Sequence, residues 1–214
     1  REYRTERDNN IVLAFDCGRT MVEPIAGLPR LDRAISAGLL TAYASLKMGD
    51  RVSVFSFAAR PGAMSAACSG PGSFTAVKRA AAQLDYSAEE ANFTLAMSTL
   101  SQKLNRRSLI ILFADFVDTI SAELMLGSIG RLLKNHVLLC VTIADEELET
   151  LVAAEPQEAD DVARAVVAAG LLRERRIVLE RLRRMGVDVL EAPWRELGPA
   201  LTRRYLETKR QQRL

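Results

Sequence analysis

The chain has 214 residues, 49% of them hydrophobic, which is enough to bury a full core and fits a single domain spanning residues 1–214. With 29 Lys and Arg against 27 Asp and Glu, its net charge of +2 gives no electrostatic basis for general nucleic-acid binding. One histidine, His136, and three widely spaced cysteines exclude most histidine-based catalysis, a poly-histidine metal centre and a disulfide framework.

The cysteines and the apolar runs also bear on the compartment. The cysteines favour a reducing environment, and no apolar run approaches the roughly 20 residues needed to cross a bilayer. We therefore expect this chain to be soluble, in the cytoplasm or at a membrane. It starts at Arg1 with the charged segment REYRTERD, which favours a piece of a longer protein.

The first half of the chain alternates strand and helix patterns. Its strand segments are apolar on both faces, as in buried parallel strands, and its helical segments place apolar residues at steps of three and four. In chain order these are a strand at 10–16, a helix at 30–50 with Gly49 as its stop, a strand at 51–57, a short edge strand at 62–70, and helices at 73–84 and 94–104.

The second half continues the alternation. An acidic, Ala-rich stretch lies around Pro156, before a long helical pattern, and the arginine runs within that pattern are predicted to lie on solvated faces. In chain order the segments are a strand at 108–115, a helix beginning near Ser121, a strand at 136–143, a helix at 157–185, a strand at 187–192 and a helix at 194–210.

This alternation predicts a doubly wound α/β fold. Its sheet is mostly parallel, with one short antiparallel edge strand and helices on both faces. In such folds ligands bind at the carboxyl ends of the strands. Two of the predicted strands end there in carboxylates, Asp16 and Asp115.

A divalent cation is one use of these carboxylates. If their strands are neighbours, Asp16 and Asp115 reach one ion, and the hydroxyl of Thr20 in the loop after Asp16 adds a further oxygen ligand. The alternative is that each aspartate only caps the turn or helix that follows its strand.

Three known classes of protein have a functional aspartate at the end of the first strand, and the segment DCGRT, residues 16–20, matches their motifs to different degrees. A haloacid dehalogenase-type phosphatase needs a second aspartate at position 18, where this chain has Gly18. Sugar kinases and actin-like ATPases show D-x-G-x-T, but on a hairpin between antiparallel strands, whereas a loop and a long helix follow here. The remaining use is D-x-S-x-S, the first part of a metal-ion-dependent adhesion site.

Longer stretches resemble one family over essentially the whole chain. They are EYRTERDNNIVLAFDCGRTM, LDRAISAGLLTAYASLKMGDRVSVFSFAA, RRSLIILFADFVD and the ending RYLETKRQQRL. Their order and spacing are similar to the von Willebrand factor A fold, and more closely to the bacterial family catalogued as domain of unknown function 58.

The resemblance implies a degenerate adhesion site. Asp16 matches its first aspartate, Gly18 replaces its first serine, Thr20 matches its second hydroxyl residue and Asp115 matches its late aspartate. Ala91 stands where the family has a loop threonine. A magnesium or manganese ion held by Asp16, Thr20, Asp115 and waters is therefore expected to bind weakly.

Residues around this site could contribute in other ways. Asn92 and Thr94 are possible replacements for the loop threonine, although Thr94 falls at the start of a predicted helix. Arg19 either pairs with a strand-end aspartate and takes over the role of the cation, or points to solvent. With Phe93 and Phe116 it is a candidate partner-binding rim, unless these aromatic rings fill space under the loops.

The resemblance implies a function without catalysis. Members of the family are often encoded beside a MoxR-type AAA+ ATPase and are thought to help assemble client proteins, and many carry transmembrane helices upstream of this domain. We therefore expect a protein-interaction module. The alternative is a magnesium-dependent phosphoryl-transfer or hydrolytic enzyme using Asp16 and Asp115, but the sequence has no Ser-His-Asp set, no Walker loop and no GxGxxG motif.

Overall fold

The computed structural model describes residues 8–116 and 119–211. In chain order the elements are β1 (Asn10–Asp16), α1 (Arg19–Val22), β2 (Pro24–Ile25), β3 (Leu28–Pro29), α2 (Arg30–Lys47), β4 (Arg51–Phe57), β5 (Pro61–Met64), β6 (Cys68–Ser69), the 3-10 helix η1 (Pro71–Ser73), α3 (Phe74–Ala81), α4 (Phe93–Lys103), β7 (Ser108–Phe113), α5 (Thr119–Leu132), β8 (Val137–Ile143), α6 (Glu146–Ala153), α7 (Ala159–Arg184), β9 (Asp188–Ala192) and α8 (Leu197–Arg210).

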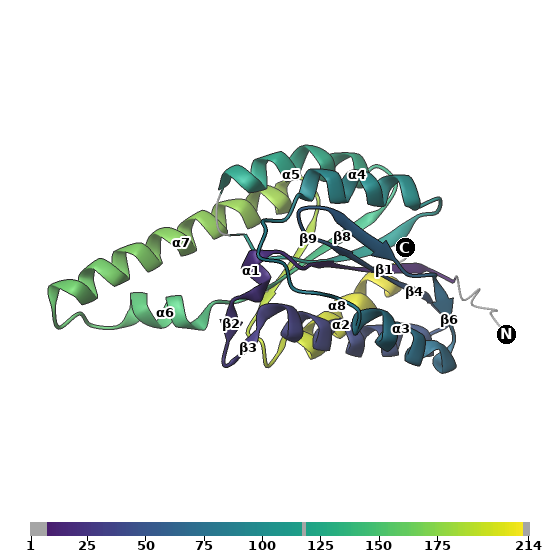
Figure 1. The fold of residues 1–214 in the computed structure, drawn as a ribbon, viewed down its shortest axis with the longest axis horizontal. Helices are drawn as coiled ribbons and strands as arrows, with labels where there is room; N and C mark the ends of the chain where they lie inside the picture. Colours follow the sequence, from purple (N-terminus) through teal and green to yellow (C-terminus); the bar gives the residue numbers. More distant parts are fainter. Residues whose placement is uncertain (1–7, 117–118, 212–214) are drawn as a thin grey trace.

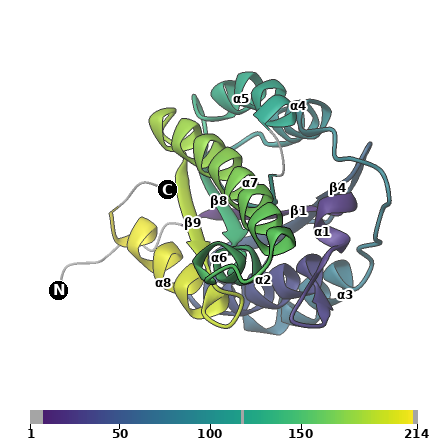
Figure 2. The ribbon, with the colours of Figure 1, turned by 90° about the vertical axis from the view of Figure 1, so that its left-hand side faces the viewer.

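A central sheet separates two layers of helices (Figure 1). Its strand order is β5-β4-β1-β7-β8-β9, and β6 also pairs with β4. The pairs among β4, β1, β7, β8 and β9 are parallel, while β5 and β6 are antiparallel to β4. Helices α2, α3 and α8 cover one face, and α4, α5 and the second half of α7 cover the other (Figures 1 and 2).

The structure confirms the predicted doubly wound fold. The first two predicted strands match β1 and β4 residue for residue, and the strand at 136–143 is one residue longer than β8. The single edge strand expected at 62–70 is instead two short strands, β5 and β6, both paired with β4.

Some short elements fall in segments without a clear periodic pattern. Residues 24–29 form the hairpin β2–β3, in which Ala26 and Gly27 have φ angles of 49° and 79°, the left-handed conformation of a two-residue hairpin turn. The acidic stretch before Pro156 contains α6. These elements have no counterpart among the predicted helices and strands, because two-residue strands and two helical turns give too few repeats to reveal a period.

Packing on both faces of the sheet fixes the site. On the α2 face, the rings of Phe15 and Phe113 stack with their centroids 4.6 Å apart, against Gly38 of α2. On the other face, Val12, Ile110 and Leu138 from three neighbouring strands join one buried cluster. Because β1 and β7 are parallel neighbours, their carboxyl ends lie side by side at the same end of the sheet.

No helix in the described ranges combines the length and the apolar composition that crossing a membrane requires.

Candidate functional site

The two predicted strand-end aspartates meet at the carboxyl edge of the sheet. Asp16 is the last residue of β1, and Asp115 follows β7 by two residues. These strands are parallel neighbours, with Phe15 opposite Phe113. Both carboxylates are buried, Asp16 at 0% and Asp115 at 7% exposure, and they are close enough for the charge of Asp115 to influence the pKa of Asp16.

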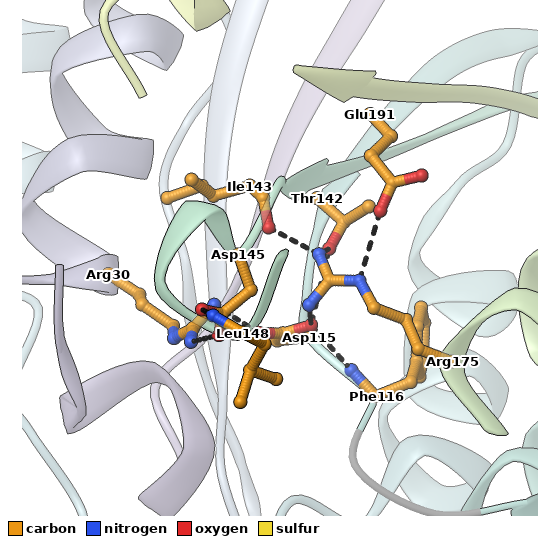
Figure 3. Close-up of polar contacts among 9 residues, drawn as sticks. All are labelled: Arg30, Asp115, Phe116, Thr142, Ile143, Asp145, Leu148, Arg175 and Glu191. Atoms are coloured by element: carbon orange, nitrogen blue, oxygen red, sulfur yellow. Dashed lines mark hydrogen bonds and ion pairs between the residues drawn. The ribbon is translucent and has the colours of Figure 1, made fainter. Parts of the chain in front are cut away.

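Two arginines hold Asp115 (Figure 3). Arg30, the first residue of α2, donates from Nη1 to Asp115 Oδ2 at 2.7 Å. Arg175, in the middle of α7, places Nη1 2.7 Å from Asp115 Oδ1. The backbone N–H of Phe116 and the hydroxyl of Thr142 also donate to Oδ1, at 2.9 and 3.3 Å. Both carboxylate oxygens are therefore engaged by protein donors.

The same arginines extend the network to neighbouring elements (Figure 3). Arg30 Nη2 lies 2.5 Å from Asp145 Oδ2. Arg175 donates to Thr142 Oγ1 at 2.6 Å and to the carbonyl of Ile143, and its Nε lies 3.1 Å from Glu191 Oε1. Because Arg30 and Arg175 are only 6% and 7% exposed, this is a buried network of charges whose members compensate one another.

Asp145 joins this network to the start of α6. Its side chain accepts from the backbone N–H of Leu148, which makes it the N-cap of that helix. Burial alone would raise the pKa of Asp145, but the hydrogen bonds from Arg30 and Leu148 lower it below the ordinary 3.8. Asp145 therefore stays ionised at neutral pH.

Asp16 has a different environment. Its Oδ1 accepts from the backbone N–H of Gly18 at 2.7 Å, while Oδ2 has no hydrogen-bond partner among the residues that the structure describes. Burial raises the pKa of Asp16 from 3.8 to about 7, the Gly18 hydrogen bond opposes the rise, and the charge of Asp115 adds to it. The two strand-end carboxyl groups thus differ, because Asp115 is paired with two cations, whereas Asp16 lacks a cationic partner among the described residues and is about half protonated at neutral pH.

These residues do not fit a divalent cation well. A Cβ built on Gly18 would lie 3.0 Å from Asp16 Oδ1, from the backbone N of Ala91 and from the carbonyl O of Glu89, so a serine at this position would require these neighbours to shift. Ala91 beside it offers no side-chain oxygen. Asp115, the second carboxylate, already binds Arg30 and Arg175, and their charges oppose a further cation.

The remaining predicted ligands lie in α1 and at the start of α4. Thr20 is half-buried in the short helix α1, four residues after Asp16. Asn92 is the N-cap of α4, and its side chain accepts from the backbone N–H of Leu95 at 3.0 Å. Thr94 lies in the first turn of α4, as predicted from the sequence, and it is exposed. Within the described ranges, no three His, Cys, Asp or Glu side chains are grouped as a metal site.

The proposed rim contains one exposed residue. Arg19 is exposed and forms an ion pair with Glu90 at 2.6 Å, so it reaches neither strand-end aspartate. Phe93 and Phe116 are 8% and 5% exposed, and their ring centroids lie 5.7 Å apart in the core. The two aromatic rings therefore fill space under the loops, the alternative given above, and Arg19 alone offers surface to a partner.

The site has little room for a substrate. A cavity of about 10 Å³ lies beside Asp115, lined by residues that include Arg30, Met21 and Thr142, which is enough for about one water molecule. Burial also raises the pKa of the Cys17 thiol, the nearest candidate nucleophile, to about 12. It is therefore protonated and unreactive at neutral pH.

Sequence reasoning missed the two arginines that define this site. Arg175 lies within the run RERR (residues 173–176), which was predicted to be solvated. That prediction is correct for Arg173 and Arg176, which are exposed, and wrong for Arg175. The available signal was position, because Arg175, Val178 and Leu182 follow one another at steps of three and four, on the buried side of α7.

The chain is similar to one protein family in sequence and to several solved structures in fold. A family model described as "Protein of unknown function DUF58" matches residues 1–178, and no curated protein matches. Among solved structures, the conserved hypothetical protein BatB from Bacteroides thetaiotaomicron has a TM-score of 0.53 at 9% identity, covering 91% of this chain and 98% of that one. The SpRpn10 VWA domain has a TM-score of 0.51 at 11% identity, covering 90% and 93%.

A von Willebrand factor type A structure from Catenulispora acidiphila is also similar, with a TM-score of 0.45 at 15% identity. That match covers 83% of this chain but 42% of the other, so this chain spans less than half of that protein.

Proposed function

Because the chain belongs to the DUF58 family of proteins of unknown function and has a von Willebrand factor A-type fold, we propose that it is a non-enzymatic protein-interaction module. The observation that carries the proposal is the state of Asp115. At the position where the fold family uses a carboxylate as a metal ligand, this chain binds it between two buried arginines. Asp115 is thus held by two arginines of the same chain rather than left open to a metal ion.

The partner that we propose is a MoxR-type AAA+ ATPase, acting with this protein in the assembly or maturation of a client protein in the cytoplasm or at a membrane. The exposed surface near Asp16 supports a partner at this edge. It includes Arg19, paired with Glu90, and the β2–β3 hairpin, where Leu28 is 45% exposed.

Co-purification tests this partnership. The chain, immobilised and incubated with the MoxR-type ATPase of its own source and ATP, is expected to retain the ATPase. A variant carrying Arg19→Glu and Leu28→Asp should lose it. Met48→Asp is the matched control, because Met48 is 40% exposed and lies at the end of α2, near the amino ends of the strands and away from Arg19 and Leu28. Failure of the unmodified chain to retain the ATPase would contradict the proposal.

Metal binding at Asp16, Thr20 and Asp115 is proposed to be weak at most. Magnesium tolerates water ligands, but an ion here would compete with Arg30 and Arg175 for Asp115. Calorimetric titration of the chain with magnesium and with manganese is expected to show no saturable binding at metal concentrations up to about 1 mM. Tight binding that Asp16→Asn abolishes would show instead that the site retains metal function.

The enzymatic alternative, phosphoryl transfer or hydrolysis with Asp16 and Asp115 around magnesium, ranks second. Asp115 is already paired, and the adjacent cavity has room for about one water molecule. A panel of phosphate esters and nucleoside triphosphates, with and without magnesium, is expected to show no turnover. Turnover lost in Asp16→Asn would establish this alternative.

A further inference from the structure

The feature that the interaction role leaves unexplained is a helical arm, defined as residues 146–172. It consists of α6, the connecting loop and the first half of α7, and it projects beyond the sheet (Figure 1). Helix α6 has no buried residue, and in the arm's part of α7 only Ala168 is buried. The two helices contact each other. Because almost none of their residues is buried, little else of the described chain covers them.

Apolar residues gather on the outside of this arm. Of thirteen exposed large apolar side chains in the described part of the chain, six belong to its 27 residues; these are Leu151, Val152, Val162, Val166, Val167 and Leu171. Val166 and Val167 are 65% and 63% exposed, more than any of the others. An exposed apolar surface of this kind is a mark of an interaction site in a water-soluble segment.

The exposed residues of α7 form a continuous stripe. At 100° per residue, positions 162, 166, 170, 163, 167 and 171 follow one another around half of the helix, and Val, Val, Gly, Ala, Val and Leu occupy them. All six are exposed. The half-buried Ala165 and Leu172 and the buried Ala168 lie on the opposite side. This part of the helix is therefore apolar on both sides, and the side that carries the three valines faces solvent.

The negative charge of the arm indicates which kind of partner would bind this stripe. The arm carries seven Asp and Glu against one basic residue, Arg164. Glu146, Glu147 and Glu149 begin α6, and Glu158 and Asp160 lie at the start of α7. Anionic lipid headgroups and a second copy of the same arm would both be repelled by these carboxylates, whereas Lys and Arg around an apolar face would be attracted.

We propose that the stripe on the outer side of the arm docks a basic amphipathic helix of another protein. From Val162 to Leu171 the stripe is about 14 Å long, enough for two to three turns of a helix whose apolar residues face it. This inference rests on the proposed interaction role and adds a surface separate from Arg19 and Leu28.

The buried ion pairs support such a role because they fix the base of the arm. Asp145, paired with Arg30, caps α6 where the arm leaves the sheet, and Arg175, paired with Asp115, lies three residues after its other end. The arm is therefore held at both ends by the same network. Holding a docking helix in place before its partner arrives reduces the entropy lost on binding.

A designed peptide tests the arm with the full chain. The probe is a fluorescent 18-residue amphipathic helix made of Leu and Lys, and binding is followed by fluorescence anisotropy. We expect saturable binding that weakens as salt is raised, with at least tenfold loss in the double variant Val166→Gln, Val167→Gln. A peptide with Glu in place of Lys, and a scrambled Leu and Lys peptide, should bind at least tenfold more weakly.

Matched variants separate the stripe from general stickiness. Leu40→Gln with Leu95→Gln changes exposed leucines on α2 and α4, at 45% and 44% exposure, and should leave peptide binding unchanged. Equal binding by the Val166→Gln, Val167→Gln variant would overturn the proposal. So would equal binding of the Glu peptide, dimerisation through the stripe in sedimentation, or stripe-dependent binding to phosphatidylglycerol vesicles. Capture of the ATPase is a separate readout, so the two proposals can fail independently.

Discussion

Asp115 connects residues from both helical layers at the edge of the sheet. Arg30 comes from α2 on one face and Arg175 from α7 on the other, and each guanidinium lies 2.7 Å from a different oxygen of the same carboxylate. Arg175 further reaches Thr142 and the carbonyl of Ile143 on β8. A single buried carboxylate thus joins two helices and two strands, and removing one partner leaves uncompensated charge in the interior.

Replacing Arg175 should therefore be costly. Arg175→Met keeps an unbranched apolar stem but leaves Asp115 with one arginine and the Ile143 carbonyl without this donor. We expect the free energy of unfolding to fall by about 3–5 kcal/mol. Arg176→Met, at the exposed neighbouring position, should change it by less than about 0.5 kcal/mol. Urea denaturation measures both, and equal stabilities of the two variants would argue against a structural network.

The raised pKa of Asp16 predicts that the stability of the protein depends on pH. Its pKa rises from 3.8 in the unfolded chain to about 7 in the folded one. Well below pH 4 both states bind the proton, so the contribution is constant. Between the two values only the folded state keeps it, so stability falls as pH rises, and the cost, up to about 4 kcal/mol, is complete above the folded pKa.

Asp16→Asn removes this cost and retains an oxygen acceptor for the Gly18 N–H. In buffer with a chelator, the variant should exceed the wild type in stability at pH 8, and the difference should shrink steadily toward pH 5. Asp85→Asn, at an exposed carboxylate, is the control and should show no such trend. A stability difference independent of pH would contradict the assignment of the raised pKa to Asp16.

The sequence located the carboxylates of the site but not their partners. Asp16 and Asp115 were predictable because a carboxylate that ends an apolar strand is a local pattern. Their pairing with Arg30 and Arg175 is not local, because these residues lie 85 and 60 positions from Asp115 along the chain. An arginine within a charged run looks solvated unless its helical phase is compared with that of buried neighbours such as Val178.

At the scale of elements, the fold followed from periodicity. Strands β1, β4 and β8 are apolar on both faces, which only a sheet covered on both sides satisfies, and the structure confirms this arrangement. The arm was less predictable. Helix α6 was not predicted, because its segment was recognised only as acidic and Ala-rich. The helical pattern of α7 does not show that its first half leaves the core, because an apolar stripe that faces solvent has the same periodicity as one that faces a sheet.

Two glycines in helices offer opposite predictions. A Cβ on Gly38 of α2 would lie 2.8 Å from Phe15 Cζ and 3.2 Å from Phe113 Cζ, whereas one on Gly170 of α7 meets nothing within 4 Å. Gly38→Ala should destabilise the protein by about 1–3 kcal/mol through overpacking, although alanine favours helix. Gly170→Ala should stabilise it by about 0.5–1 kcal/mol. Urea midpoints decide, and the same sign for both would contradict this packing.

At the scale of the whole molecule, the sheet extends beyond the residues that the family model matches. That match ends at residue 178, within α7. Strand β9 nevertheless pairs with β8 from Leu139 opposite Asp188 to Ile143 opposite Ala192. Helix α8 then packs on α2, with Leu201 and Tyr205 fully buried. We propose on this basis that residues 1–214 form a single domain.

Truncation tests this proposal. A chain ending at Gly186 loses β9 and α8, which exposes one side of β8 and removes the apolar cover of α2. It also removes Tyr205 and Lys209, whose side chains bind the buried Asp50 at 2.5 and 2.8 Å. We expect the shortened chain to lose its cooperative urea transition.

A point variant of the full-length chain checks the same contact without shortening the chain. Leu201→Asp places a carboxylate in the interface between α8 and α2, and it should lower the free energy of unfolding by about 3 kcal/mol or more, since a buried charge there has no partner. Circular dichroism and urea denaturation measure both effects. If the chain ending at Gly186 unfolds cooperatively at the same midpoint as the full-length chain, β9 and α8 are dispensable additions and the domain needs nothing beyond the end of α7.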